Sequence, residues 1–250
     1  DTANQRKHYF EEAVGQALRE LWDEGFCSRE ELFLQTKFTY MRGQDHRLPY
    51  DKRAPLSTQV EQSFESSLEH LHTDTIDAYL LHGPASREGL TDGDWEVWQA
   101  MEKLHDSGRV RQLGVSNVSP DQLSALVAGA RVRPSFVQNR CYARRGWDAL
   151  IRKICHEEQI RYQGFSLLTA NRRELARPEI QAIARSHGAT VPQVVFAFAM
   201  QQGMLPLTGT SSEKHMRQDL ASDSFRLSAE ECNQIATGLD SNPEPTPARG

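Results

Sequence analysis

Short apolar runs alternate with amphipathic stretches along nearly the whole chain, and this alternation constrains the fold more than any other feature. Six runs have the length and composition of strands: residues 32–37, 76–81, 110–115, 136–138, 160–165 and 204–207. Six further stretches carry helical patterns: residues 10–24, 57–72, 95–107, 120–130, 148–158 and 192–202. Repeated alternation of strands and helices predicts βα units and a parallel sheet.

Local signals mark several of the helix ends. Ser57, followed by Glu61, and Ser119, followed by Pro120, are expected to begin helices, because serine caps a helix and proline is tolerated in its first turn. Glycines just past a helix end favour the left-handed conformation that stops it. Four glycines are expected to have this role: Gly108, Gly129, Gly188 and Gly203.

The strand count decides between two α/β architectures. A closed (β/α)₈ TIM barrel needs eight strands, so six leave a deficit, and we expect the N-terminal strands to be missing from this chain. The alternative is an open doubly wound sheet, but no G-x-G-x-x-G loop follows any expected strand. We therefore expect an N-terminally incomplete barrel domain over residues 1–239 and a disordered polar tail over residues 240–250.

Composition excludes several classes of protein. The 250 residues are 38% hydrophobic with a net charge of −5, which favours a globular core and argues against nucleic acid as the main partner. No apolar run has the length of a membrane span, and no segment resembles a signal peptide. The four cysteines form no C-x-x-C pair, so we expect reduced thiols in a cytoplasmic protein and no metal site.

Ionisable residues close two of the expected strands. Lys37 ends the first apolar run, and His82 follows the second run immediately before Gly83 and Pro84. In a barrel of parallel strands this end carries the chemistry. A lysine reaching solvent and a hydrogen-bonded loop histidine are the structural alternatives for each residue alone. The two together predict an enzyme.

The order of several residues along the chain adds a family resemblance. Asp1 opens the chain, Tyr9 lies where the first helix begins, and Lys37 and His82 end two strands. This set resembles the catalytic Asp, Tyr, Lys and His of the aldo-keto reductases, a family of (β/α)₈ oxidoreductases that depend on a nicotinamide cofactor. The resemblance extends through later segments and covers nearly the whole chain: residues 114–117, Gln138, residues 164–168 and residues 208–220.

The resemblance implies a role for each of the four residues in the reduction of an aldehyde or ketone. Tyr9 is expected to be the general acid and Lys37 to favour release of its proton, since a neighbouring ammonium stabilises a phenolate. Asp1 is expected to anchor the lysine, and His82 to orient the carbonyl. In the family pattern the tyrosine follows the aspartate by five positions, where this chain has Arg6. We infer a three-residue insertion within residues 4–8.

The resemblance also implies a nicotinamide site. Ser116, Asn117 and Gln138 are expected to bind the carboxamide, whose acceptor and donors a hydroxyl and two amides can match. Turn formation is the alternative for Ser116 and Asn117. Phe165 stands where the family usually has a tyrosine that stacks on the nicotinamide ring. Backbone groups of Ser166 and Leu168 are expected near the pyrophosphate.

The segment that follows the last strand departs from the family pattern. NADP-selective members carry a Lys-Ser pair and then an Arg, and Gly209, Thr210 and His215 replace these three after Thr208. Lys214 and Arg217 still supply positive charge, and a helix beginning near Ser212 can bind phosphate at its N-terminus. Asp219 is expected to contact the adenine amine. NADP, as NADPH, is the expected cofactor on family habit, and NAD is the alternative.

The remaining expectations concern the substrate and competing functions. The long segment 38–56 is rich in tyrosine and in charges of both signs, which indicates a solvated surface loop and specifies no compound beyond a small-molecule carbonyl substrate. One competing function is a regulatory subunit of this fold that binds cofactor with little turnover, as in the β-subunits of potassium channels. The other is an inactive fragment or pseudoenzyme.

Overall fold

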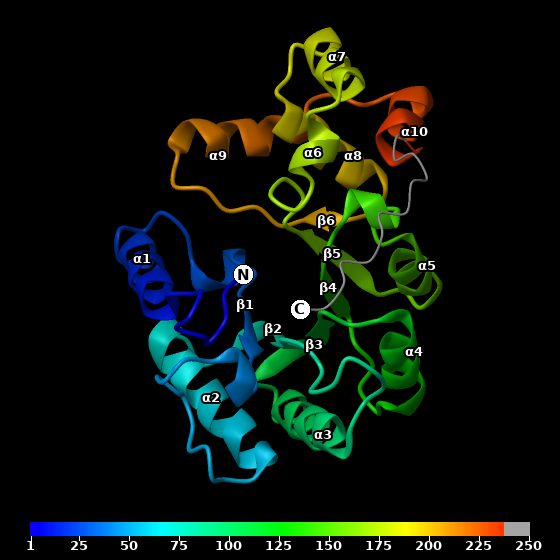
Figure 1. Ribbon diagram of the computed structural model, residues 1–250. Helices are drawn as coiled ribbons and strands as arrows, with labels where there is room; N and C mark the ends of the chain where they lie inside the picture. Colours follow the sequence, from blue (N-terminus) through cyan, green and yellow to red (C-terminus); the bar gives the residue numbers. More distant parts are fainter. Residues whose placement is uncertain (238–250) are drawn as a thin grey trace. The chain divides into compact units, whose positions relative to one another are not determined.

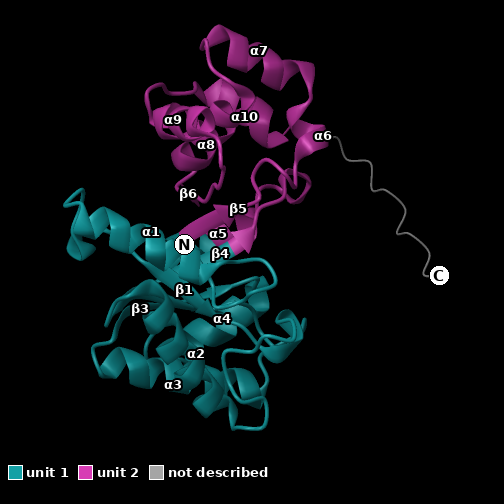
Figure 2. Cartoon of the chain, turned by 90° about the vertical axis from the view of Figure 1, so that its left-hand side faces the viewer, with its two compact units in different colours: residues 1–138, 153–161 teal, residues 139–152, 162–250 magenta. Residues whose placement is uncertain are grey.

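The computed structural model describes residues 1–237 and divides into two compact units. Unit 1 contains Asp1–Gln138 and Lys153–Arg161, and unit 2 contains the rest of the described chain (Figure 2). The tail expected over residues 240–250 lies outside the described residues.

Parallel strands form the centre of unit 1. Its strands are β1 (Gln35–Phe38), β2 (Ile76–Leu81), β3 (Val110–Ser116) and the first residues of β4 (Phe136–Arg140), in spatial order β1-β2-β3-β4. The register pairs Lys37 with Leu80, and Leu80 with Gly114. Every residue of β1 and β2 is buried. This explains why β2 is apolar apart from Asp77, which pairs with Arg29 and Arg111, since helices cover a parallel sheet.

Helices cover the strands of unit 1. They are α1 (Glu11–Asp23), α2 (Leu56–Leu71), α3 (Asp92–Asp106) and α4 (Pro120–Gly129), and Figure 1 shows them outside β1–β3. Short 3₁₀ helices lie at η1 (Arg29–Glu31) and η2 (Met41–Gly43), and α5 (Ala149–Glu157) begins in unit 2 and ends in unit 1. The core of the unit includes fully buried Phe64, Tyr79 and Trp98.

Two glycines permit close packing in unit 1. A Cβ on Gly15 would lie 1.8 Å from the carbonyl oxygen of His70, so α1 packs directly on the backbone of α2. A Cβ on Gly129 would lie 2.6 Å from the ring of Trp95 in α3. Glycine at these positions sets the distance between neighbouring helices.

Unit 2 combines a short pair of strands with helices. Its strands are β5 (Arg161–Phe165), whose first residue belongs to unit 1, and β6 (Leu205–Pro206), and they pair in parallel. The buried face of α8 contributes Val194, Val195 and Phe198, and Trp147 packs on Phe198 with ring centroids 5.1 Å apart. Its helices are η3 (Ala143–Arg145), α6 (Arg172–Leu175), α7 (Pro178–Ser186), α8 (Val191–Gln201), α9 (Glu213–Leu220), η4 (Ala221–Asp223) and α10 (Ala229–Thr237).

The structure confirms the predicted order of strands and helices and corrects several details. All six expected strands are present among the described residues, with β2 matched residue for residue. Ser119 caps α4 as predicted, but Pro55, not Ser57, precedes α2. Gly129 lies inside α4, where Trp95 leaves no room for a side chain. The sequence prediction lacked α6, α7 and α10, whereas α9 begins beside Ser212, where a helix was expected.

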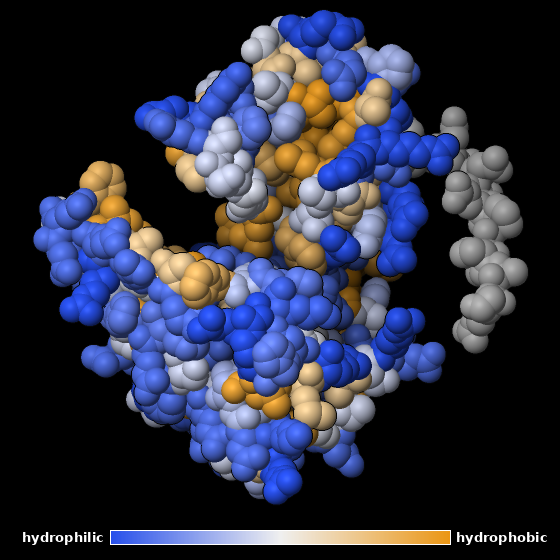
Figure 3. All heavy atoms as spheres, turned by 60° about the vertical axis from the view of Figure 1, so that its left-hand side comes forward, coloured by the Kyte–Doolittle hydropathy of each residue, from blue (hydrophilic) through white to orange (hydrophobic). Residues whose placement is uncertain are grey.

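Three features bear on the class of protein: the hydropathy of the surface, the length and apolar character of the helices, and the state of the cysteines. The face of unit 1 seen in Figure 3 is mainly hydrophilic, with separate apolar patches. Among the described residues, no helix combines the length and the apolar character needed to cross a membrane. All four cysteines are free; Cys141 and Cys155 are buried, whereas Cys27 and Cys232 are partly exposed.

Candidate active site

A buried ion pair lies at the carboxyl end of β1. The side chain of Lys37 is fully buried, and its Nζ donates to Asp1 Oδ1 at 2.7 Å and to the Thr2 carbonyl at 2.8 Å. Gln35 Nε2 and Gln138 Nε2 donate to the same Asp1 oxygen at 2.5 and 3.1 Å. The carboxylate therefore fixes the lysine, as expected of an anchor, and is itself held from β1 and β4.

The segment between Asp1 and α1, where we infer a three-residue insertion, forms a turn. The amides of His8 and Tyr9 both donate to the Gln5 carbonyl, at 3.2 and 3.0 Å. Buried side chains anchor the start of the turn, since Asn4 Nδ2 donates to the Ser63 carbonyl and Gln5 Nε2 to the Gly43 carbonyl. Residues 6–8 are exposed. The turn thus projects three residues outward and returns Tyr9 to the site.

Tyr9, Lys37 and His82 meet in unit 1. Lys37 Nζ lies 5.3 Å from the centroid of the Tyr9 ring. The rings of Tyr9 and His82 pack edge to face with centroids 5.8 Å apart. Together with the contact between Lys37 and Asp1, these distances bring all four predicted catalytic side chains into one cluster.

His82 is tied to both neighbouring strand ends. Its amide donates to the Phe38 carbonyl at 2.9 Å, and its carbonyl accepts from Asn117 Nδ2 at 2.8 Å. The ring Nδ1 lies 2.7 Å from Thr39 Oγ1. Backbone and side chain are therefore both held, and within the described residues no hydrogen bond reaches Nε2.

Burial governs the ionisation of the cluster. It lowers the pKa of Lys37 to about 7, and the Glu11 carboxylate acts in the opposite direction. It also lowers the pKa of His82 to about 3, assisted by the charges of Lys37 and His8. Burial raises the pKa of Tyr9, the opposite direction from that expected beside an ammonium. At neutral pH the cluster therefore holds a protonated phenol and a neutral imidazole.

The three residues expected at the nicotinamide carboxamide adjoin the cluster. Ser116 and Gln138 are register partners on β3 and β4, and Ser116 Oγ donates to the Gln138 carbonyl at 2.6 Å. Asn117 has a positive φ of 55° and donates to Ser116 Oγ at 3.0 Å as well as to the His82 carbonyl. Ser116 and Asn117 thus form the turn at the end of β3, and the same two residues are expected to bind the nicotinamide carboxamide.

Sequence reasoning missed two residues of the cluster, Gln35 and Thr39. Both point to the same side of the chain as Lys37, because they lie two positions before and after it and side chains alternate along a strand. Gln35 contacts Asp1 and Thr39 contacts His82. The signal was polar residues at every second position through Lys37.

Unit 2 holds the residues expected at the nicotinamide ring and the pyrophosphate. Phe165 ends β5, and Ser166 follows with a positive φ of 56°. The turn after it is held by Asn171, which is fully buried and donates to the carbonyls of Cys141 and Leu167, both at 2.9 Å. Leu168 lies in this turn and is partly exposed. Asn171 was not predicted, and no sequence pattern marked it.

The loop from β6 to α9 holds the remaining expected residues. Thr208 Oγ1 donates to Asp219 Oδ2 at 2.8 Å, and Ser212 is the N-cap of α9, as expected for a helix beginning near it. Gly209, Lys214 and His215 are exposed, and Thr210 Oγ1 accepts from the Ser212 amide at 3.1 Å. Arg217 is paired with Glu213 at 2.6 Å. Lys214 and His215 lie in the first turn of α9, where an anion binds favourably.

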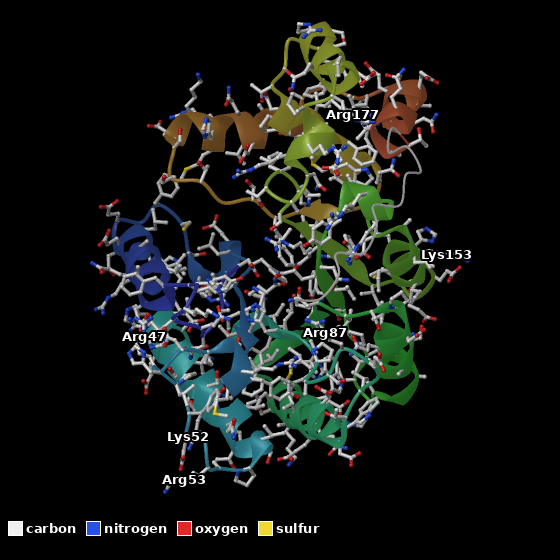
Figure 4. All side chains as sticks on the ribbon, viewed as in Figure 1. Arg47, Lys52, Arg53, Arg87, Lys153 and Arg177 are labelled. Atoms are coloured by element: carbon white, nitrogen blue, oxygen red, sulfur yellow. The ribbon has the colours of Figure 1, made fainter. Side chains whose placement is uncertain are left out.

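The segment between β1 and α2 has the charged surface expected of it. Arg47, Lys52 and Arg53 point outward from this segment in Figure 4. Arg47 pairs with Asp45, and Arg42 donates to the carbonyls of Pro84 and Ala85 just beyond His82. Part of the positive charge in this segment is therefore used within unit 1.

The arrangement suits proton transfer and polarisation of a small polar group. It combines the half-buried phenol of Tyr9, the Lys37 cation beside it and a neutral imidazole in contact with the phenol ring. Within the described residues, no group of three or more His, Cys, Asp or Glu side chains is placed to bind a metal ion.

Comparisons with known proteins identify the family. The Aldo/keto reductase family model matches residues 1–239. An uncharacterized oxidoreductase, YtbE of Bacillus subtilis (strain 168), is 28% identical over 225 residues, which are 90% of this chain and 74% of the relative. Aldo-keto reductase family 4 member C11 of Arabidopsis thaliana is 30% identical over 82% of this chain and 66% of its own length. The chain thus spans between two thirds and three quarters of these relatives.

Solved structures agree. The aldo-keto reductase AKR2E5 of the silkworm Bombyx mori, also solved in complex with NADPH, has a TM-score of 0.80 and 25% identity in both forms. The alignments cover 96% of this chain and 72% and 73% of the silkworm chains. The predicted α/β TIM-barrel fold is confirmed, although the six described strands do not form a closed barrel. The chain belongs to the aldo/keto reductase family.

Proposed function

We propose that the protein reduces the carbonyl of an aldehyde or ketone with NADPH. The observation that carries the proposal is the convergence of Asp1, Tyr9, Lys37 and His82 in one cluster of unit 1, despite the longer segment before Tyr9. Family membership and a silkworm relative complexed with NADPH support it.

Each residue has a role in the proposed reaction. A bound nicotinamide cofactor supplies the hydride. Tyr9 donates its phenolic proton to the carbonyl oxygen, and burial keeps the phenol protonated until then by raising its pKa. Lys37 stabilises the phenolate that remains, and Asp1 holds the ammonium in position. His82, which is neutral because burial lowers its pKa to about 3, donates a hydrogen bond that orients the carbonyl.

The polar side chains at the ends of β3 and β4 fit the nicotinamide carboxamide. Ser116 supplies a hydroxyl, and Asn117 and Gln138 each supply an amide with donors and an acceptor. From the family resemblance we assign the nicotinamide ring to Phe165, and the phosphates and adenine to the turns after β5 and β6. The residues concerned are Ser166, Leu168, Thr208, Gly209, Thr210, Lys214, His215 and Asp219.

The first-turn positions of Lys214 and His215 favour NADPH over NADH, because the additional phosphate of NADPH is an anion. Titration of both reduced cofactors, followed by protein fluorescence, is expected to show tighter binding of NADPH. A preference for NADH would contradict this cofactor assignment.

The test of the proposed function is Tyr9→Phe, with Tyr142→Phe as the matched control. Tyr142 packs against Arg144 and Arg145 in unit 2. We expect Tyr9→Phe to lower kcat for a small aldehyde by about a hundredfold or more, as loss of a general acid does, while NADPH binding is retained. Tyr142→Phe is expected to retain activity.

The regulatory-subunit alternative gives a different result in the same assay. It requires wild-type protein that binds NADPH tightly and yet reduces aldehydes and ketones with little turnover. That outcome, or full activity of Tyr9→Phe, would refute the proposed reaction.

A further inference from the structure

Thr39 contacts the site histidine through its side-chain hydroxyl. It directly follows β1, is 5% exposed, and places Oγ1 2.7 Å from His82 Nδ1. This distance is typical of a good hydrogen bond. Because Thr39 lies two residues after Lys37, its side chain is on the same face of the chain as that of Lys37.

The surroundings of Thr39 restrict its side chain. Its carbonyl accepts from Tyr50 Oη at 2.8 Å and from Gln44 Nε2 at 3.4 Å, which fixes the backbone. Its methyl group lies against Gly43, where a Cβ would come within 2.7 Å of Thr39 Cγ2. The hydroxyl is therefore directed at His82 by packing on one side and by hydrogen bonds to the backbone on the other.

The direction of the hydrogen bond follows from the available partners. Burial lowers the pKa of His82 to about 3, so the ring is neutral and carries one proton. Among the described residues the Thr39 hydroxyl has no other acceptor, and a buried donor without an acceptor is costly. The hydroxyl therefore donates to Nδ1, and the single ring proton resides on Nε2.

We propose that Thr39 is a positioning residue that holds His82 as the Nε2–H tautomer, so that this nitrogen donates to the substrate carbonyl. The part of the proposal that concerns the substrate rests on the proposed function; the tautomer itself does not. Thr39 thus controls which ring nitrogen carries the donor, while the backbone contacts of His82 fix where the ring lies.

The direct test is nitrogen NMR of protein labelled with ¹⁵N-histidine, with the His82 signals assigned by their loss in His82→Gln. Wild-type protein is expected to show a protonated Nε2 and an unprotonated Nδ1. Thr39→Val keeps the shape and removes the hydroxyl, and it is expected to mix the two tautomers, so that both nitrogen shifts move toward one another. Thr39→Ser keeps a hydroxyl and is expected to restore the wild-type shifts.

Kinetics provide the second measurement. Thr39→Val is expected to lower kcat/KM about three- to tenfold, the factor for loss of one neutral hydrogen bond, with NADPH affinity unchanged. Thr39→Ser is expected to recover most of the loss, which a simple packing role of the methyl group would not allow.

The outcomes separate this inference from the proposed function. A protonated Nδ1 in the wild type, or a tautomer that Thr39→Val leaves unchanged, overturns the inference whatever the activity. If the tautomer responds as expected but wild-type protein reduces no carbonyl, the role of Thr39 stands and the proposed function fails.

Discussion

Replacing Lys37 by methionine isolates the contribution of one charge. Lys37 Nζ lies 5.3 Å from the Tyr9 ring centroid, and at an effective dielectric constant of about 20 a pair of unit charges at that distance interacts by about 3 kcal/mol. A proton that is half transferred in the transition state experiences roughly half of this, so kcat is expected to fall about tenfold. If the proton is completely transferred in the transition state, kcat is expected to fall by more than about a hundredfold.

The variant is expected to fold. Methionine is close to lysine in length, and Asp1 Oδ1 keeps the amide donors of Gln35 and Gln138. The assay follows oxidation of NADPH by its absorbance with a small aldehyde at saturating concentrations, and a separate titration measures NADPH affinity. We expect a lower kcat with NADPH affinity essentially unchanged.

Lys153→Met is the matched control. The Lys153 side chain is 74% exposed, lies on α5 and points away from the ribbon in Figure 4. This substitution is expected to leave kcat within experimental error. If Lys37→Met is as active as the control, the electrostatic reasoning is wrong, because a buried charge at this distance from the proton donor would then have no effect.

Two other predictions follow from the ionisation and packing of unit 1. Because Lys37 has a pKa of about 7, loss of its proton is expected to lower kcat/KM as pH rises through that value. His82 has a pKa of about 3, so its titration adds no change in kcat/KM between pH 3 and pH 7. A kcat/KM that stays constant through neutral pH would contradict the need for the ammonium. Gly15→Ala is expected to lower the free energy of unfolding by about 1–3 kcal/mol, because a Cβ would lie 1.8 Å from the His70 carbonyl oxygen. Gln16→Ala, at the exposed neighbouring position, is expected to have no such effect. Unfolding in urea measures both variants, and equal midpoints would refute the packing argument.

The sequence predicted the parts of the fold that depend on strong local patterns. β2 is apolar at all but one of its positions, and it was located residue for residue. α9 is polar over most of its length and exposes all but two of its eight residues, so the sequence indicated where this helix begins, near Ser212, but offered no apolar stripe from which to read its extent. The place of Gly129 as the last residue of α4, rather than the residue after it, was also unpredictable, because it depends on the tertiary contact with Trp95.

The site shows a similar division. Lys37 and His82 were identifiable because ionisable residues end apolar runs, and the structure brings them together with Asp1 and Tyr9. The path by which Tyr9 returns to the site depends on the buried anchors Asn4 and Gln5, whose partners are distant in sequence. Asn171 likewise has a role only through its contacts with other segments of unit 2.

The alternation through β1 determines where this protein tolerates changes in length. Gln35, Lys37 and Thr39 reach the site because each is two residues from the next, and one inserted or deleted residue would turn those beyond it to the opposite face. The exposed turn at residues 6–8 imposes no such periodicity, since only its buried ends are anchored. Changes in length are therefore compatible with the turn, whereas the length of β1 is fixed by the side chains that it brings to the cluster.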